Sequence, residues 1–455
     1  MQIAYSGYIF VGTRNIFQGD VAMDYQRQIE EISNYIRSGE KKNNELKLGL
    51  EFEHFVIDKE TLKTVSYYGK NGVSETLKVL ESNGWSSTYE GEYILGLDKE
   101  NKSITLEPGS QLELSLKAKS KIKDVEKEYI EFLSEIIPIL ESKGQGLMAV
   151  GYHPETKIDD IKILPKKRYD FMFNYFKQTG THAHNMMKGS SALQVSVDYM
   201  NEEDYKKKYR VINALSPVMY SIFENARYFE GEIRDEHAIR AFIWENTDKD
   251  RSGIVEGALS DDFSYNKYAE FILNNPPILM VKDGVAASTG DKKVRDIFDP
   301  ENYKIEELEH FLTMFFPDVR TKRYMEIRMM DSIPYPLNFA AVAMWKGILY
   351  NEEILDKVYE YIKELTVDDV NKAKLDMNDV GMASKLKDKT LLDIGKWIVE
   401  LAKTGLDKDE VKYIYPLEEM LLENKNPYMI TKENEIHGKK QALDWCLLNN
   451  LIEVK

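Results

Sequence analysis

The sequence has very little cysteine and no long hydrophobic run. Its 455 residues include one cysteine, Cys446, so no disulfide can form within the chain, which fits a reducing compartment such as the cytoplasm. Cys446 lies in an apolar pattern with Leu443 and Leu447, which predicts a packed helix residue rather than a thiol nucleophile. The longest apolar stretches, 211–223 and 332–345, contain proline and are too short to cross a bilayer, so no membrane attachment is expected.

Several catalytic motifs are also missing. The sequence has no G-x-x-x-x-G-K-[ST] phosphate loop, no G-x-G-x-x-G dinucleotide motif, no G-x-S-x-G nucleophile elbow and no H-E-x-x-H zinc motif. The sequence therefore lacks the motifs that usually identify Walker-type ATPases, Rossmann dehydrogenases, α/β-hydrolases and zinc peptidases. His182 and His184 have a spacing that could suit a metal, but no third histidine or cysteine lies nearby, so a loop is favoured over a zinc site.

Positive charge is in deficit. The 61 Lys and Arg residues oppose 77 Asp and Glu residues, which gives a formal net charge of −16 at pH 7. Nucleic acids are bound by basic surfaces, so no nucleic-acid partner is expected. ATP is not excluded, because carboxylates can hold its phosphates through metal ions. The composition is otherwise that of a globular protein with a sizeable core, since 43% of the residues are hydrophobic.

The order of the predicted elements indicates an α+β fold with an antiparallel sheet. The expected helices are 24–37, 72–83, 123–142 and 202–223, and the expected strands are 46–57, two within 103–115, 147–152, 191–199 and 323–329. Residues 232–295 are turn-rich and charged, and we interpret them as a long functional insertion. The predicted organisation is a possible N-terminal extension (1–22), a catalytic core (23–350) and a mainly helical C-terminal region packed on the core (351–455).

Four of the predicted strands carry polar residues on one face. Residues i and i+2 of a strand point the same way, and this rule separates an apolar face from a polar one. The polar face would hold Glu51, Glu53, Glu107, Gln111, Glu113, Ser115, Gln194, Ser196, Asp198, Glu326 and Arg328. Crowded carboxylates repel one another, and Mg²⁺, which prefers carboxylate and phosphate oxygens, relieves that repulsion. A concave metal- and nucleotide-dependent platform and an ordinary solvated sheet face both fit this pattern.

Two further segments could bind an anion. The charged turn 247–251 could hold phosphate or a substrate carboxylate, and it could equally be a solvated loop. Arg240 lies in an otherwise apolar stretch, 238–244, so it needs a partner such as a substrate carboxylate or an internal acid.

At these positions the sequence resembles the plant-type and proteobacterial glutamate–cysteine ligases, which are carboxylate–amine ligases with a glutamine-synthetase-like catalytic sheet. The blocks L-E-P-G-S-Q-L-E-L-S (106–115) and T-D-K-D-R-S-G (247–253) are the most specific. The other matching stretches are 49–53, 167–170, 186–187, 193–195, 243–244 and 322–328, and all of them follow the order of the family. The C-terminal third matches only loosely.

The resemblance implies an ATP-dependent enzyme that joins the γ-carboxylate of glutamate to an amine, normally that of cysteine, through a γ-glutamyl phosphate. ATP and Mg²⁺, or Mn²⁺ in its place, would be the cofactors, and the partners would be small molecules. By this resemblance the metal-binding residues are Glu51, Glu53, Glu107, Glu113 and Glu326, and the catalytic cations are Arg328, Arg323 and Arg251. Substrate would be bound by Arg240, Gln194, Trp244 and Met186, and nucleotide by Gln111, Lys249 and Arg251.

The sequence departs from the family pattern around the predicted substrate pocket, at 182–185, Ser196, 241–242 and Asn246. These departures leave the acceptor amine open. The leading hypothesis is formation of γ-glutamylcysteine for thiol biosynthesis of the glutathione type. The alternatives are a γ-glutamyl or other carboxylate–amine ligase that uses another amine, and a non-catalytic nucleotide-binding sensor. The oligomeric state is left open.

Overall fold

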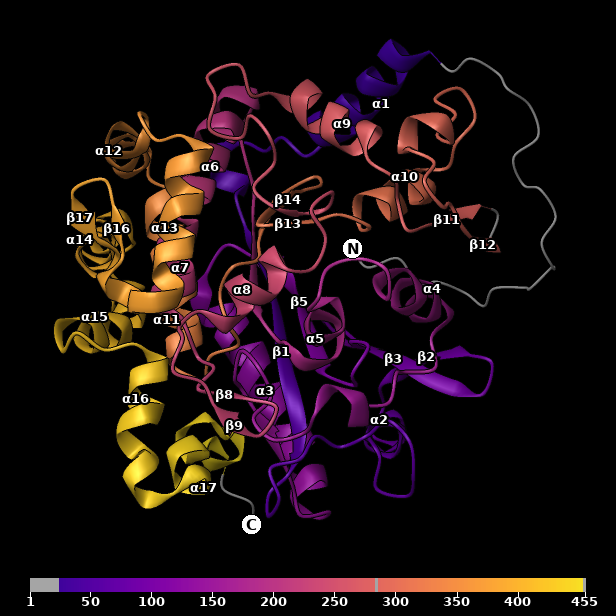
Figure 1. The fold of residues 1–455 in the computed structure, drawn as a ribbon, viewed down its shortest axis with the longest axis vertical. Coiled ribbons are helices and arrows are strands. Elements are labelled where there is room, and N and C mark those ends of the chain that lie inside the picture. Colours follow the sequence, from indigo (N-terminus) through magenta and orange to yellow (C-terminus); the bar gives the residue numbers. More distant parts are fainter. Residues whose placement is uncertain (1–23, 283–284, 453–455) are drawn as a thin grey trace.

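An antiparallel sheet runs through the centre of the protein (Figure 1). The structure, a computed structural model, describes residues 24–282 and 285–452. The strand order is β14-β15-β7-β1-β5-β4-β3-β2, and β6 pairs with the end of β1. The strands are β1 (Leu48–Asp58), β2 (Ser86–Glu90), β3 (Tyr93–Lys99), β4 (Lys102–Leu106), β5 (Leu112–Lys119), β6 (Gln145–Met148), β7 (Leu193–Val197), β14 (Val319–Thr321) and β15 (Met325–Ile327).

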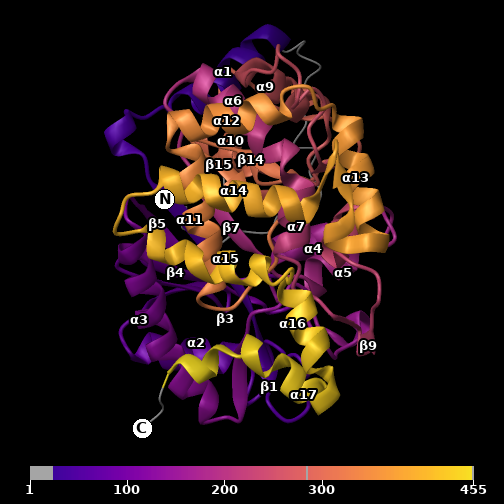
Figure 2. The same cartoon turned by 90° about the vertical axis from the view of Figure 1, so that its left-hand side faces the viewer.

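Helices surround this sheet. Those of the first 350 residues are α1 (Tyr25–Arg37), α2 (Val73–Ser82), α3 (Ile122–Glu141), α4 (Lys167–Phe176), α5 (Ala183–Gly189), α6 (Glu202–Ala214), α7 (Ser216–Ile222), α8 (Ile239–Glu245), α9 (Tyr265–Asn274), α10 (Ile305–Leu312) and α11 (Leu337–Leu349). They are followed by α12 (Glu352–Ile362), α13 (Val367–Val380), α14 (Leu391–Gly405), α15 (Tyr415–Leu422), α16 (Pro427–Asn434) and α17 (Lys439–Leu443). The later helices gather on one side of the molecule (Figure 2).

The apolar face of the sheet packs on α3 and α11. The ring of Phe52, on β1, lies 4.4 Å from that of Tyr129 on α3 and 5.8 Å from that of Phe339 on α11, measured between centroids. All three side chains are buried. Burial of these large apolar groups stabilises the packing of the helices on the sheet. It therefore determines which face of β1 points toward α3 and which face points away from it.

The predicted α+β fold with an antiparallel sheet is confirmed. Helix 202–223 is divided into α6 and α7 at Ser216 and Pro217, because proline cannot donate the hydrogen bond that would continue α6. Strands β2 and β3 were not predicted. Within 232–295, interpreted as an insertion, the structure forms α8, α9 and the hairpin β11–β12 (Leu279–Lys282 and Val285–Ser288).

The C-terminal helices share one hydrophobic core with the sheet, through residues such as Ile398 and Leu421. The domain boundary at residue 350 stays a prediction. The predicted N-terminal extension, 1–22, lies outside the described residues. Within the described part, no helix combines the length and the apolar character needed to cross a bilayer.

Candidate active site

Strand pairing brings the predicted acidic residues onto one face of the sheet. Glu53 of β1 lies directly opposite Glu113 of β5, and Glu51 lies opposite Ser115. Glu326 of β15 lies opposite Ser196 of β7. Because β7 also pairs with β1, these acids belong to neighbouring strands of a single sheet.

Glu107 joins this group from the turn between β4 and β5. The turn closes when the Glu107 backbone N–H donates to Gln111 O at 2.9 Å and the Ser110 N–H donates to Glu107 O at 2.8 Å. Ser110 has a φ of 73°, a left-handed conformation that side chains other than glycine adopt rarely. The turn therefore holds Glu107 beside β5 at some cost in backbone strain.

These carboxyl groups lie in an environment that disfavours their charged forms. Burial, together with the charges of neighbouring glutamates, raises the pKa of Glu51 and of Glu53 to about 8 and that of Glu113 to about 7. Burial also raises the pKa of Glu107, although cations near it act in the opposite sense. Four acids are thus crowded without enough protein cations to balance them.

Two of the four have polar partners and two do not. Glu53 accepts hydrogen bonds from the Gln194 amide at 2.6 Å and from the Ala192 N–H at 2.8 Å, and Glu113 accepts one from the Thr105 hydroxyl at 2.7 Å. In the described chain, neither a hydrogen bond nor an ion pair joins the carboxylates of Glu51 and Glu107 to another residue. Together these largely enclosed carboxylates, two with hydrogen-bond partners and two without, are a donor set that fits Mg²⁺. The side chains are not arranged as a finished metal site. Among the described residues, no three side chains of Asp, Glu, His or Cys lie close enough together to hold a metal ion.

Glu326 has different surroundings. Its carboxylate accepts hydrogen bonds from Arg320 at 2.5 Å and from Arg328 at 2.6 Å, and it forms an ion pair with Lys322 at 3.2 Å. Burial by itself would raise the pKa of Glu326, but these three cations hold that pKa well below its usual range. Glu326 is therefore the predicted metal ligand that forms ion pairs with protein cations.

Gln194 and Arg328 connect the two groups of acids. The Arg328 guanidinium donates to the Gln194 side-chain oxygen at 2.5 Å, while the Gln194 amide donates to Glu53. Trp244, on α8, lies with its ring 5.9 Å below the same guanidinium. The structure thus brings three of the predicted site residues to the polar face.

Arg240 occupies the end of this face, where it has an internal acid as a partner. Its guanidinium donates to the carbonyl oxygens of Arg328, Met329 and Met330 and pairs with Asp331 at 3.2 Å. Burial raises the pKa of Asp331 to about 6, and the charge of Arg240 opposes that rise. The sequence left two partners open for Arg240, a substrate carboxylate or an internal acid, and the structure shows the internal acid.

The charged turn after α8 points its arginine inward. Arg251 is fully buried, pairs with Asp248 at 2.5 Å, donates to the Tyr175 hydroxyl at 2.7 Å and also bonds to Pro276 O. Lys249 is exposed to solvent. The structure does not place either residue among the acids of the sheet, and the visible role of Arg251 is to anchor this turn to α4.

Three other predicted site residues lie apart from the acids or are fully engaged elsewhere. The Gln111 amide donates to Met187 O and Ser190 O and accepts from the Gly109 N–H, so it ties the 107–111 turn to α5. Met186 lies within α5 and is buried. Arg323 lies in the turn between β14 and β15, where its guanidinium is 5.0 Å from the ring of Tyr35 on α1.

The structure adds Arg320 and Lys322, which the sequence interpretation did not assign. Alternation along one strand could not have indicated them, because the chain turns between Thr321 and Met325, and it is the pairing of β14 with β15 that sets Arg320 opposite Glu326. Lys166 is a further addition: it lies near Glu107 and Glu113, whose charges raise its pKa, while burial lowers it.

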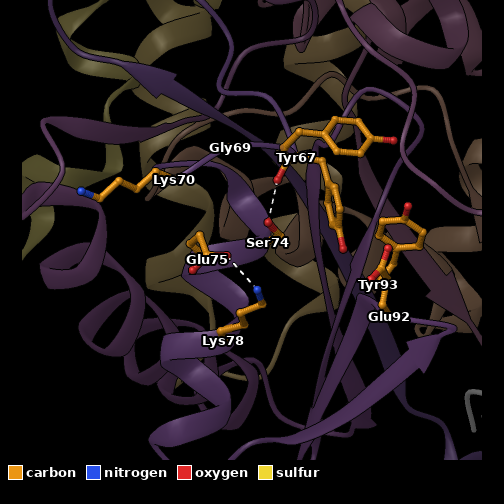
Figure 3. Close-up of a pocket in the computed structure, with 9 residues that line it drawn as sticks. Tyr67, Gly69, Lys70, Ser74, Glu75, Lys78, Glu92 and Tyr93 are labelled. Atoms are coloured by element: carbon orange, nitrogen blue, oxygen red, sulfur yellow. Dashed lines mark hydrogen bonds and ion pairs between the residues drawn. The ribbon is translucent and has the colours of Figure 1, made fainter.

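Two surface hollows lie away from this face. Figure 3 shows a recess of about 500 Å³ beside α2, walled by Tyr67 and Tyr93 and by Lys78, which pairs with Glu75 at 2.8 Å. A second recess of about 620 Å³ lies between α6 and α12. Neither includes a predicted site residue, so the site is identified by its charges and hydrogen bonds.

The crowded acids should make stability depend on pH and on metal. Above pH 4.5 the unfolded chain loses its glutamate protons, whereas the folded chain keeps those of Glu51, Glu53 and Glu113 up to about pH 7–8. The buried histidines His54, His153 and His310, with pKa values lowered by burial to about 3, have the opposite effect, but mainly below pH 6.5. We therefore expect the free energy of unfolding of chelator-treated protein to fall as pH rises from about 6.5 to 8.

Urea titrations across this pH range, with and without Mg²⁺, measure the effect. Mg²⁺ should stabilise the protein more at pH 8 than at pH 6.5, because binding replaces the protons that the acids would otherwise keep. A metal-free stability that stayed constant or rose across this range would contradict the prediction.

The fold and the sequence matches define the class of this protein as a ligase. A model described as glutamate–cysteine ligase family 2 matches residues 47–423, which is most of the chain. The chain belongs to this family.

Curated relatives agree with that assignment. The chloroplastic glutamate–cysteine ligase of Brassica juncea is 30% identical over 393 residues, covering 85% of this chain and 76% of the relative. That of Arabidopsis thaliana is 29% identical over 387 residues, covering 83% of this chain and 74% of the relative. A crystal structure of glutamate–cysteine ligase from Francisella tularensis in complex with AMP has a TM-score of 0.52 at 12% identity and covers 90% of this chain and 88% of that one. This last match shows the fold.

Proposed function

We propose that this protein joins the γ-carboxylate of glutamate to the amine of cysteine at the expense of ATP, giving γ-glutamylcysteine, ADP and phosphate. The observation that carries the proposal is the buried sheet face on which four unbalanced glutamates adjoin Arg328 and Arg320. Such a face suits phosphoryl transfer, which needs positioning and charge neutralisation rather than a protein nucleophile. Family membership agrees with this chemistry.

The reaction proceeds in two steps. A γ-carboxylate oxygen of glutamate forms a bond to the terminal phosphorus of ATP, and the bond from that phosphorus to the bridging oxygen breaks, so that ADP leaves. The neutral amine of the acceptor then attacks the acyl carbon, the carbon–oxygen bond to phosphate breaks, and the nitrogen loses a proton. Arg328, held by Glu326 and Gln194, is placed to stabilise the charge that develops on the phosphate.

Mg²⁺, or Mn²⁺ in its place, would neutralise the phosphates of the nucleotide when bound. We propose Glu51, Glu53, Glu107 and Glu113 as its ligands, because their charges lack balance in the protein alone. Glu326 remains a candidate fifth ligand, although it already holds three cations. The predicted nucleotide contacts of Lys249, Arg251 and Gln111 would require rearrangement of the 107–111 and 248–253 turns.

For the substrate, the proposed contacts are Arg240, Trp244, Gln194 and Met186. Arg240 is held rigidly at the end of β15 by three backbone carbonyl groups. A rigid cation can bind a carboxylate with little loss of side-chain entropy.

Replacing Arg240 by Ala should raise the KM for glutamate at least about tenfold more than the KM for ATP, because only glutamate loses a charged contact. Steady-state kinetics with each substrate varied in turn measures both values. Arg240→Lys is the matched control, since it keeps the charge beside Asp331 and should restore part of the loss. Equal changes in the two KM values would count against this role.

The activity is tested by ADP release from ATP and Mg²⁺ with glutamate, with and without cysteine, and with the mass of the product. Turnover with cysteine supports the proposal, and turnover only with another amine from a panel would favour the alternative ligase, with the pocket changed at 182–185, Ser196 and 241–242. ATP binding without ADP release for any pair would favour a sensor. We propose a reducing compartment such as the cytoplasm, which agrees with the single, buried Cys446.

A further inference from the structure

Three cations surround the carboxylate of Glu326. Arg320 contacts both of its oxygens, at 2.5 and 3.3 Å, Arg328 contacts one at 2.6 Å, and the Lys322 ammonium lies 3.2 Å away. Together these four side chains have a formal charge of +2. A buried cluster with surplus charge is costly unless further opposite charge is supplied.

The surplus charge is directed outward. The Glu326 side chain is completely covered, whereas the side chains of Arg320, Lys322 and Arg328 keep 10%, 16% and 14% of their surface exposed. The acid therefore lies under the cations, and an incoming ligand would meet the cations. Such an arrangement favours the binding of an anion.

The position of the cluster relative to the other acids indicates which anion. Glu326 is paired across to β7, and β7 is paired to β1, which carries Glu51. Gln194 lies opposite Glu51 and accepts a hydrogen bond from Arg328 at 2.5 Å, so a cation of the cluster lies beside the proposed metal ligands. A phosphate group that is shared between metal ions and arginines needs both kinds of group side by side.

We propose that Arg320 and Lys322 act with Arg328 to bind the terminal phosphate of the nucleotide and to keep hold of it during its transfer, while Glu326 positions the three cations beforehand. The inference rests on the proposed function and names two binding residues for it. During transfer the bond between the terminal phosphorus and the oxygen of ADP breaks as the bond to the substrate carboxylate forms. The three outer oxygens of the phosphate can stay on the same cations throughout.

The test compares a non-hydrolysable ATP analogue with ADP, both with Mg²⁺, by calorimetry. Arg320→Met and Lys322→Met should each weaken binding of the ATP analogue about tenfold or more and binding of ADP less than about threefold, because ADP lacks the terminal phosphate. Affinity for Mn²⁺ without nucleotide should be kept or increased, because a positive charge beside the acids is removed, and this separates the effect from a lost metal site. Lys267→Met, on the surface of α9, is a matched loss of one cation, since the Lys267 side chain is 48% exposed.

Arg320→Lys and Lys322→Arg keep the charge, and they guard against variants that fail to fold. We expect them to recover most of the affinity for the ATP analogue. Equal weakening for both nucleotides, or unchanged affinity for the analogue in folded variants, would overturn the inference while the proposed function stood. A wild-type protein that bound neither nucleotide would overturn both.

Discussion

Glu113→Gln should lower turnover about a hundred- to a thousandfold and leave the protein folded. The substitution keeps the size of the side chain and an oxygen for the Thr105 hydroxyl, which now donates to Glu113 at 2.7 Å. It removes one negative charge from the crowded face, opposite Glu53. A neutral amide is a poor ligand for Mg²⁺, so the phosphates of ATP would lose part of their neutralisation.

The same substitution should stabilise the metal-free protein, and this opposite effect makes the test specific. Burial raises the pKa of Glu113 to about 7, so at pH 8 the fold must accommodate an ionised group that it disfavours. Removing that charge should increase the free energy of unfolding by about 3 kcal/mol at pH 8 and change it little at pH 4, where the carboxyl is protonated in the folded chain and mostly protonated in the unfolded chain. Chemical unfolding at the two pH values measures this difference, and Ser115→Ala on the same face serves as a variant without a charge change.

Near-normal turnover of Glu113→Gln would contradict the metal-binding role. Lower stability at pH 8 together with lost turnover would indicate a structural defect instead. Loss of turnover combined with a gain in stability is the outcome that both the charge crowding and the metal-binding role require.

Strand alternation predicted much of this face. The apolar residues of β1, such as Leu50 and Phe52, alternate strictly with Glu51 and Glu53, and the side chains of a strand have a period of two. The sheet could bury only one of the two sets, so the acids were fixed on the other face before any contact was known. Glu326 followed from the same rule on β15.

The rule failed where the chain turns. A strand was expected over 323–329, but Lys322 and Arg323 lie in the turn between β14 and β15, where alternation does not determine the direction of a side chain. The sequence interpretation chose Arg323, which the structure places over Tyr35. It left out Lys322, which pairs with Glu326. Only the pairing of β14 with β15 distinguishes the two.

The contacts of loop residues were harder to predict from the sequence, because their partners come from distant segments. Gln111 bonds to Met187 O, and Arg251 bonds to the Tyr175 hydroxyl; in both pairs the partners are 76 positions apart in sequence. Composition shows that an arginine or an amide needs partners, and it does not show whether a ligand or the fold supplies them. The same limit applied to Arg240, whose internal acid, Asp331, lies 91 positions away.

Glu326→Gln should also abolish turnover, but with the opposite effect on the fold. Its carboxylate is fully covered and holds Arg320, Lys322 and Arg328 together. A glutamine there would accept fewer charge-assisted hydrogen bonds and would leave three neighbouring cations without a counter-charge. Breaking a buried ion pair from one side typically costs about 3–5 kcal/mol, so we expect a loss of stability of that order.

Anion binding should then distinguish the variants of the two glutamates. In Glu326→Gln the three cations have lost their counter-charge, so inorganic phosphate should bind to them and restore part of the lost stability. Phosphate should have little effect on the stability of Glu113→Gln. Thermal unfolding with phosphate and with chloride at equal ionic strength measures this difference. If phosphate stabilised both variants equally, Glu326 would be acting like the other acids of the face. A selective rescue of Glu326→Gln would place the negative charge of Glu326 and that of a bound phosphate on the same three cations, and would explain why a sheet face crowded with acids surrounds one of them with cations.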